Sequence, residues 1–142
     1  MFSRLQPDTR TVASKIGKKA IESMVQVLVV DDEPCLLKAM VRLLKTEECE
    51  VLTATNVVEA LQVAQEHKPD ILITDYNLGG QLDGLDLCQA FAHDAGLATA
   101  RRVLVSGYAV NHLDKALLFD SFIAKPFTAQ EFLRALDSDY TT

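Results

Sequence analysis

VQVLVVDDEP, residues 25–34, sets a near-continuous apolar run directly against three acidic residues and a proline. A short apolar run rich in valine is typical of a strand that is covered on both faces of its sheet. A proline is well tolerated in the first turn of a helix, and the apolar residues after it recur three and four positions apart. The stretch therefore predicts a buried strand over 25–30, an acidic turn, and a helix that begins at Pro34.

The same change of period repeats along the rest of the chain. Strands are predicted over five ranges: 25–30, 50–55, 69–75, 101–107 and 121–127. Helices are predicted over four ranges: 34–47, 56–67, 84–94 and 128–139. Alternation of this kind predicts an α/β protein with a flavodoxin-like (βα)5 fold, a doubly wound parallel five-stranded sheet in the strand order 2-1-3-4-5.

Side-chain caps mark two of the predicted helix starts. Asn56 is the N-cap of one helix. Thr128, with Glu131 three residues later, forms a capping box at the start of another. The segment 108–120 has only a weak helical pattern, so we expect its helix to be short or irregular.

Composition limits the class of protein. The 142 residues fit one domain, and 49% apolar residues are ample for a core. A net charge of −6 argues against direct contact with nucleic acid. No apolar run approaches the roughly 20 residues that cross a bilayer, so no membrane span is predicted. The 3 cysteines are scattered and lack metal-binding spacing, which predicts reduced thiols in a cytoplasmic protein.

Polar residues end four of the five predicted strands. Asp31 and Asp32 follow the first strand, Asp75 ends the third, Ser106 ends the fourth, and Lys125 lies near the end of the fifth. Neighbouring strands lie only about 4.8 Å apart, so three carboxylates would crowd one edge of the sheet. Such crowding favours a bound cation or a proton, and hard oxygen ligands suit Mg²⁺. A hydroxyl and an ammonium beside them suit a phosphoryl group.

Each of these residues also has an ordinary structural explanation. An acid after a strand is often only a helix cap or a turn residue. Ser-Gly and Lys-Pro are common turn dipeptides. The functional interpretation depends on the complementary chemistry that the strand ends carry together.

The chain resembles the receiver domain of two-component response regulators over residues 25–138. The resemblance rests on five short motifs: the Asp31 and Asp32 pair, ITDYNL with Asp75, DGLDL with Gly84, LVSGY with Ser106, and AKPF with Lys125 and Pro126. Together these motifs are highly specific.

The resemblance implies that Asp75 accepts a phosphoryl group from a phosphohistidine on a sensor histidine kinase or a histidine phosphotransfer protein. It also implies that Asp32 and Asp75 bind Mg²⁺ directly, together with the main-chain carbonyl of Asn77, while Asp31 acts mostly through water. Such a domain is a signalling module in a phosphorelay. It is not an enzyme on other substrates, since it catalyses only its own phosphorylation and dephosphorylation.

The resemblance assigns further roles at the last two strands. Ser106 and Lys125 would bind phosphoryl oxygens, and the peptide bond between Lys125 and Pro126 would be cis. Ser106 and Phe122 would form the switch, in which the hydroxyl moves toward the phosphoryl group and the ring turns inward. Phe122 has no hydroxyl, so its rotation would act through packing alone. A plain core aromatic is the alternative.

Two departures from the family concern the surroundings of Asp75. The segment 77–84 is one residue longer than in many receivers and has Gly79 and Gly80 where a proline-containing turn is common, so we expect a looser loop. Tyr108 would screen Asp75 from attacking water, and an unchanged phosphoryl lifetime in Tyr108→Ala would contradict this hypothesis.

The chain divides into three predicted parts. Residues 1–24 form a basic amphipathic extension, 25–138 the receiver domain, and 139–142 a tail. The apolar residues of the extension recur every four positions: Val12, Ile16, Ala20 and Met24. The extension would dock a partner, a second copy of the chain or a membrane surface; a frayed leader or a helix leaning on the domain is the alternative.

The output of the domain and its oligomeric state each have alternatives. The output is either a downstream protein target or an attached output domain outside this chain, and homodimerisation is an option. The residues present disfavour two rival functions. A haloacid-dehalogenase-type phosphatase needs a second acid two residues after the nucleophile, where this chain has Asn77. A phosphorylation-independent interaction module usually loses an acid or the lysine, and this chain keeps them.

Overall fold

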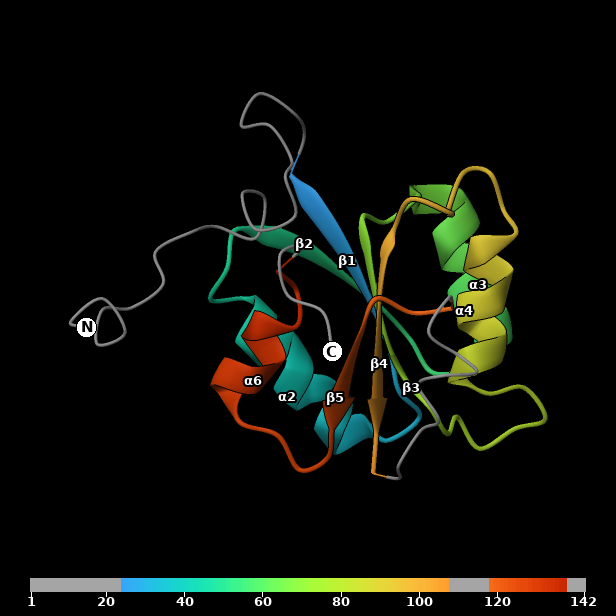
Figure 1. Ribbon diagram of the computed structural model, residues 1–142. Coiled ribbons are helices and arrows are strands. Elements are labelled where there is room, and N and C mark those ends of the chain that lie inside the picture. The colour runs from blue at the N-terminus through green and yellow to red at the C-terminus, as the bar shows by residue number, and fades with distance from the viewer. Residues whose placement is uncertain (1–23, 108–117, 138–142) are drawn as a thin grey trace.

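Five parallel strands lie at the centre of the structure, and helices flank the sheet on both sides (Figure 1). The computed structural model describes residues 24–107 and 118–137. The strands are β1 (Val25–Val30), β2 (Cys49–Ala54), β3 (Ile71–Asp75), β4 (Arg101–Ser106) and β5 (Ser121–Ala124). The helices are α2 (Pro34–Leu44), α3 (Val57–His67), α4 (Gly84–Ala92) and α6 (Ala129–Arg134). The order β2-β1-β3-β4-β5 confirms the predicted strand order.

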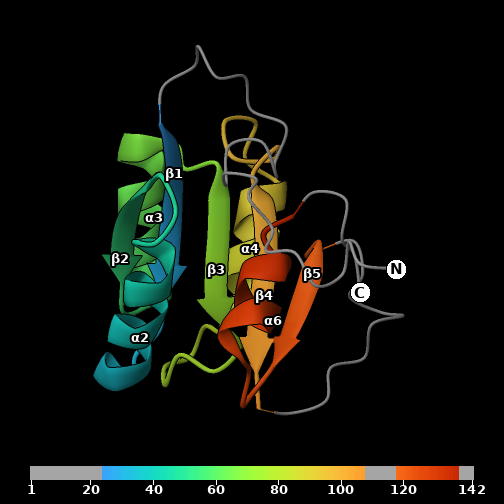
Figure 2. The ribbon, with the colours of Figure 1, turned by 90° about the vertical axis from the view of Figure 1, so that its left-hand side faces the viewer.

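The two faces of the sheet are covered by different helices. α3 and α4 lie on one face and α2 and α6 on the other, as the turned view also shows (Figure 2). Alternate side chains of a strand point to opposite faces. Leu28 and Val30 join the core beneath α3 and α4, whereas Val27 and Val29 join the core beneath α2 and α6. The run 25–30 is therefore apolar on both faces because both faces are buried.

Parallel pairing aligns the ends of the strands. Val30 of β1 pairs with Thr74 of β3, and Ser106 of β4 pairs with Ala124 of β5. The residues that follow these strands therefore emerge at the same edge of the sheet, which we call the carboxyl edge. The opposite edge, where the strands begin, is the amino edge.

Both predicted helix caps are confirmed. The Asn56 side chain accepts a hydrogen bond from the backbone N–H of Glu59 at 2.8 Å. Thr128 and Glu131 form the reciprocal pair of a capping box, in which each side chain accepts from the other residue's backbone N–H. These local contacts depend on residues three positions apart, which is why the sequence could predict them.

The last helix is shorter than predicted. The helix predicted over 128–139 ends at Arg134 within the described part of the chain. The carbonyl of Ala135 accepts hydrogen bonds from the hydroxyl of Ser121 at 2.9 Å and from Nε of Arg101 at 3.0 Å. These partners come from the amino edge of the sheet, so they stabilise the helix end through tertiary contacts.

The fifth strand also ends early. The strand predicted over 121–127 stops at Ala124. The backbone N–H of Lys125 still bonds to the carbonyl of Ser106 at 2.8 Å, but Pro126 has no N–H to continue the ladder. Six other elements differ from prediction by one to three residues at their ends: 34–47 ends at Leu44, 84–94 at Ala92, 101–107 at Ser106, 69–75 begins at Ile71, 56–67 at Val57, and 50–55 is shifted to Cys49–Ala54.

Three predictions fall on parts of the chain that are not described. The N-terminal extension up to residue 23, most of the weak helical segment 108–120, and the tail 139–142 lie outside the described residues. Within residues 24–107 and 118–137, no helix has the length and apolar character needed to span a bilayer.

Candidate functional site

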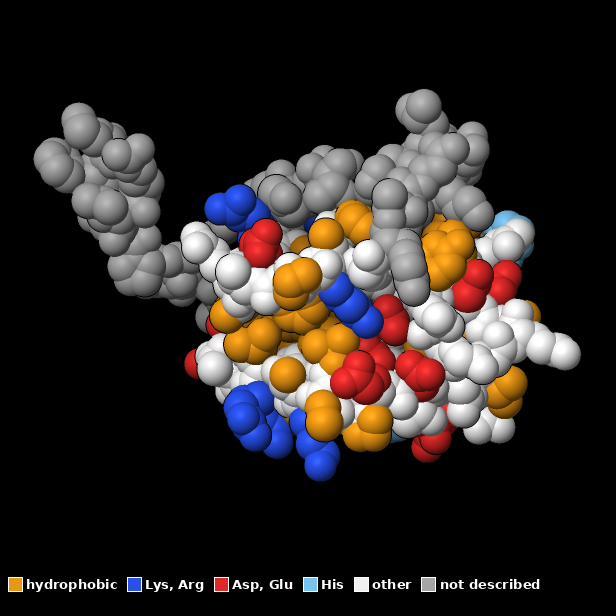
Figure 3. Space-filling model, turned by 90° about the horizontal axis from the view of Figure 1, so that it is seen from below, with side chains coloured by type: hydrophobic (Ala, Val, Ile, Leu, Met, Phe, Trp, Pro, Cys, Tyr) orange, Lys and Arg blue, Asp and Glu red, His pale blue; other side chains and the backbone are white. Residues whose placement is uncertain are grey.

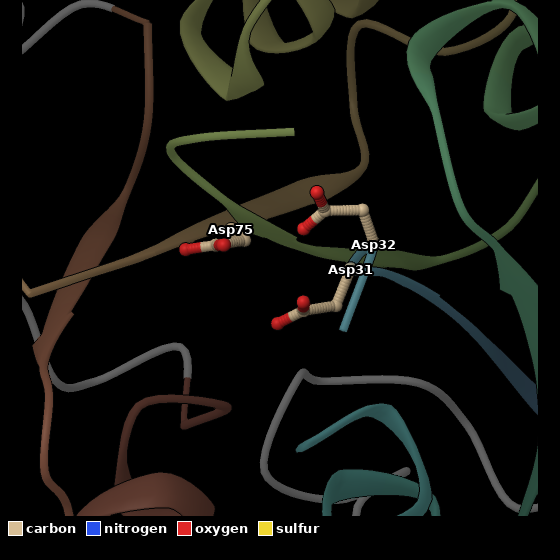
Figure 4. A group of neighbouring side chains, drawn as sticks. All are labelled: Asp31, Asp32 and Asp75. Carbon is tan, nitrogen blue, oxygen red and sulfur yellow. The ribbon is translucent and has the colours of Figure 1, made fainter. Parts of the chain in front are cut away.

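Three carboxylates meet at the carboxyl edge of the sheet. Asp31 and Asp32 follow β1, and Asp75 is the last residue of β3. Because β1 and β3 are adjacent and parallel, these side chains lie close together, as Figure 4 shows. One oxygen from each lies within 4.8 Å of the others. The sequence-based prediction of an acidic cluster here agrees with this geometry.

Asp31 is the most deeply buried of the three. Its side chain is 0% exposed. Its Oδ1 accepts a hydrogen bond from the backbone N–H of Glu33 at 2.8 Å, whereas its Oδ2 has no hydrogen-bond partner among the described residues. Burial raises the pKa of Asp31 to about 6, and the neighbouring charges of Asp75 and Asp32 act in the same direction. A buried carboxylate oxygen without a donor is costly, which indicates a missing positive partner.

Asp75 lies in contact with a lysine. Its Oδ1 is 3.0 Å from Nζ of Lys125, and the same Nζ lies 4.0 Å from Oδ2 of Asp31. Burial raises the pKa of Asp75 above its ordinary value, while the hydrogen bond and charge of Lys125 oppose that rise. One ammonium therefore faces two buried carboxylates, with Asp32 close by.

The end of β5 positions this lysine. The backbone of Lys125 is tied to β4 through the carbonyl of Ser106. The peptide bond between Lys125 and Pro126 is cis, the geometry that the resemblance implies. Ser106 itself is buried at the end of β4, beside the last residues of β5.

A cavity of about 410 Å³ opens over the group. It is lined by Asp32, Glu33, Asp75, Asn77, Gly79, Ser106, Gly107 and Lys125. Viewed from below, acidic side chains gather at the centre of this end of the molecule, next to a basic one (Figure 3). The cavity is polar and open, so it suits a small charged group.

Glycine is required where the next helix begins. The backbone N–H of Gly84 donates to the carbonyl of Tyr76 at 2.7 Å, and a Cβ on Gly84 would collide with the carbonyl oxygen of Asp75. A capping box between Asp83 and Asp86 then starts α4. This close approach explains the glycine of the DGLDL motif.

Two further predicted site residues are Asn77 and Phe122, and the structure shows their surroundings. The side chain of Asn77 is exposed, and its Oδ1 accepts a hydrogen bond from the backbone N–H of Gly79 at 3.0 Å. Phe122 is half-buried on β5 and packs against the core beneath α3 and α4. Tyr108 lies outside the described residues.

Sequence reasoning missed two contributions. The buried hydroxyl of Thr74 donates to the carbonyl of Asp75 at 3.0 Å, and the backbone N–H of Glu33 donates to the carboxylate of Asp31 at 2.8 Å. Neither contact has a sequence signal, because a threonine in a strand and an acid in a turn are both common. Fold and site together define an α/β protein with an acidic centre at the carboxyl ends of its strands.

Comparison with known proteins identifies the family. The model of the response regulator receiver domain matches residues 27–137. The chain is 30% identical over 112 residues to the heme response regulator HssR of Staphylococcus aureus, covering 78% of this chain and 49% of that protein. It is 34% identical over 117 residues to the transcriptional regulatory protein KdpE of Mycobacterium tuberculosis, covering 80% and 50%. The chain belongs to the response regulator receiver domain family.

Solved structures agree on the fold. The chemotaxis response regulator CheY4 of Vibrio cholerae has a TM-score of 0.72 at 24% identity, over 80% of this chain and 97% of that one. A response regulator receiver domain protein from Clostridium thermocellum has a TM-score of 0.68 at 28% identity, over 80% and 91%. The predicted flavodoxin-like fold is confirmed. The chain spans about half the length of the two curated relatives.

Proposed function

We propose that this receiver domain accepts a phosphoryl group from a phosphohistidine donor onto Asp75 in a Mg²⁺-dependent reaction. It would then signal through a conformational change within a two-component phosphorelay. The observation that carries the proposal is the 3.0 Å contact between Lys125 and Asp75 at the centre of the carboxylate group. Membership of the receiver family supports it.

The chemistry follows from the groups that surround Asp75. Transfer would form a bond between a carboxylate oxygen of Asp75 and phosphorus, while the bond from phosphorus to the donor nitrogen breaks. The ammonium of Lys125 lies beside this carboxylate, where it would offset negative charge on the transferred group. Ser106 lines the same cavity, and its hydroxyl would donate to another phosphoryl oxygen.

The carboxylates fit a divalent cation. Oδ2 of Asp31 is buried without a hydrogen-bond donor among the described residues, and two of the three carboxylates, those of Asp31 and Asp75, share one lysine. Asp32 and Asp75 would hold Mg²⁺ with the main-chain carbonyl of Asn77, and Asp31 would act mostly through water. Bound Mg²⁺ supplies positive charge that offsets both the repulsion among the carboxylates and the charge of a phosphoryl group.

The switch would connect the site to β5. Ser106 pairs with Ala124, and Phe122 lies two residues earlier on the same strand. A shift of Ser106 toward a phosphoryl group would therefore be passed to β5 and alter how Phe122 packs. Phe122 contacts the core beneath α3 and α4, so this change would reach that face of the molecule.

Partners follow from the proposed chemistry. The donor would be a sensor histidine kinase or a histidine phosphotransfer protein, in the cytoplasm. The signal would pass to a downstream protein or to an attached output domain. A net charge of −6 fits contact with proteins rather than nucleic acid.

The test is the intact mass of the protein after incubation with Mg²⁺ and acetyl phosphate. We expect one phosphate adduct that requires Mg²⁺ and disappears in Asp75→Ala. Asp70→Asn is the matched control, because Asp70 directly precedes the same strand that Asp75 ends. The control should carry the adduct.

Absence of the adduct would redirect the interpretation. A protein that accepts no phosphoryl group from acetyl phosphate or from phosphohistidine donors would contradict the proposal. It would favour the alternative, a receiver fold that acts as an interaction module without phosphorylation. An adduct that persists in Asp75→Ala would place the acceptor elsewhere.

A further inference from the structure

The loop between β3 and α4 passes directly against one of the three carboxylates. Gly79 has a backbone φ of +75°, a conformation that residues with a side chain adopt rarely. A Cβ on Gly79 would lie 2.7 Å from Oδ2 of Asp32, well inside van der Waals contact. The lack of a side chain here therefore leaves space for the carboxylate of Asp32.

The neighbouring glycine has no such role. A Cβ on Gly80 would meet no atom within 4 Å among the described residues. Gly80 is exposed, as is Gly79, and the two are adjacent in sequence. Their difference makes them a matched pair for experiment.

The position of Gly79 is held by the two residues that precede it. Its N–H donates to Oδ1 of Asn77 at 3.0 Å, and the residue between them, Leu78, is only 5% exposed and packs into the core beneath α3 and α4. The backbone at Gly79 is thus anchored by a turn and a buried side chain. An added methyl group would be relieved more easily by moving Asp32 than by moving the loop.

Asp32 is the one exposed carboxylate of the three. Asp31 and Asp75 are buried, whereas Asp32 is exposed and reaches the group through a short rotatable side chain. Mg²⁺ demands near-ideal octahedral geometry with ligands at about 2.0–2.1 Å. A displacement of a few tenths of an ångström at one carboxylate is therefore enough to weaken the site.

We propose that Gly79 is a positioning residue for the cation site: its bare backbone sets where the carboxylate of Asp32 lies. This inference rests on the proposed function, because the cation site is the one described there. The loop that is longer than in many receivers would thereby act on metal affinity and not on the phosphoryl acceptor itself.

Backbone conformation alone is the competing explanation. Gly79 would then be needed only for its positive φ, with no effect on Asp32. Asparagine separates the two explanations, since it tolerates a left-handed backbone better than alanine and still carries a Cβ. If the contact with Asp32 matters, Gly79→Asn and Gly79→Ala should both weaken the site.

The experiment measures Mg²⁺ binding to the full chain by isothermal titration calorimetry, with no phosphodonor. We expect Gly79→Ala and Gly79→Asn each to raise the Kd for Mg²⁺ about tenfold, and Gly80→Ala to change it less than twofold. In an Asp32→Ala background, Gly79→Ala should weaken binding no further. Thermal unfolding without metal shows that each variant is folded, and the loss of affinity should not follow the loss of stability.

A kinetic measurement adds a second readout. The Mg²⁺ concentration that gives half-maximal phosphorylation should rise in both Gly79 variants, while the rate at saturating Mg²⁺ stays within about twofold of wild type. A purely structural defect would lower the saturated rate as well.

The outcomes separate this inference from the proposed function. Wild-type Mg²⁺ affinity in the Gly79 variants, or weakening in Gly79→Ala alone, would overturn the positioning role and leave the proposed function intact. A wild-type protein that binds no Mg²⁺ would overturn both the positioning role and the metal requirement.

Discussion

At the amino edge of the sheet, two acidic side chains each accept a hydrogen bond from the backbone of a neighbouring strand, whereas at the carboxyl edge one oxygen from each of three carboxylates lies within 4.8 Å of the others. Asp70 accepts from the N–H of Gln26 at 2.9 Å, and Asp120 accepts from the N–H of Arg102 at 2.8 Å. At the carboxyl edge, Oδ2 of Asp31 is buried without a hydrogen-bond partner among the described residues. Aspartate therefore stabilises the amino edge through hydrogen bonds and destabilises the carboxyl edge through repulsion between carboxylates.

The amino edge also has a buried polar atom without a hydrogen-bond partner among the described residues. Nε of Arg102 is buried without a hydrogen-bond partner among the described residues, although another nitrogen of its guanidinium contacts the carbonyl of Cys88 at 3.5 Å. The difference between the edges is one of charge: like charges are brought together at the carboxyl edge. Three carboxylates with one lysine among them keep an excess of negative charge, which suits the binding of a positive ligand.

The largest expected effect concerns the two lysines at opposite edges. Lys125→Met should slow phosphorylation of Asp75 by acetyl phosphate about 100-fold, because the ammonium that contacts Asp75 is lost. Lys68→Met, which removes an ammonium paired with the Gln65 side chain near the amino edge, should leave the rate unchanged. Time courses of intact mass measure both rates. Equal rates in the two variants would remove Lys125 from the proposed chemistry.

The two buried serines give a second, smaller contrast. Ser106→Ala should slow phosphorylation about tenfold, since its hydroxyl lines the site. Ser121→Ala should lower the free energy of unfolding by about 1 kcal/mol, because its hydroxyl donates to the carbonyl of Ala135. Denaturant unfolding and phosphorylation rates, measured on both variants, check the pair. Slow phosphorylation in a fully folded Ser121→Ala protein would contradict the division between the edges.

Replacing an aspartate by asparagine should change the free energy of unfolding in opposite directions at the two edges. In metal-free protein at pH 7, Asp31→Asn should raise the free energy of unfolding by about 1 kcal/mol, because it removes a buried charge next to other carboxylates. Asp70→Asn should lower it by about 1 kcal/mol, because a charged acceptor becomes a neutral one. Urea unfolding in the presence of a chelator measures both. A loss of stability in Asp31→Asn would show that the site is not strained.

The smallest expected effect is the pH dependence of that contrast. The pKa of Asp31 rises from 3.8 to about 6 in the folded protein, so the folded state binds its proton more tightly than the unfolded chain. The stability that this group contributes is present below pH 4 and is lost as pH rises to about 6. The advantage of Asp31→Asn over wild type should therefore be absent below pH 4 and complete above about pH 6.

That prediction concerns the difference in unfolding free energy between two proteins, so the titrating groups that do not interact with Asp31 cancel. Unfolding of wild type and Asp31→Asn in chelator, at several pH values across this window, gives the measurement. An advantage that is constant with pH would indicate a packing effect and not the removal of a buried charge.

Local signals explain what could be predicted of the fold. Asn56 and Thr128 were identified as caps because a cap and its partner lie within one turn of helix. The end of α6 was placed too late because the groups that bind the carbonyl of Ala135, those of Ser121 and Arg101, come from the amino edge of the sheet. Contacts between distant parts of the chain have no short-range pattern.

The sequence by itself determined the class of fold, the acids at the ends of β1 and β3, and the presence of Ser106 and Lys125 at the same edge. The period of the apolar residues distinguishes strands from helices, and the alternation of the two implies parallel pairing. Only the tertiary structure decided that Asp31 is buried, with one oxygen that has no hydrogen-bond partner among the described residues, and that Asp32 is exposed. It alone placed Gly79 against Asp32. Burial and close approach depend on neighbours contributed by other strands and loops, and adjacent residues in the sequence do not specify them.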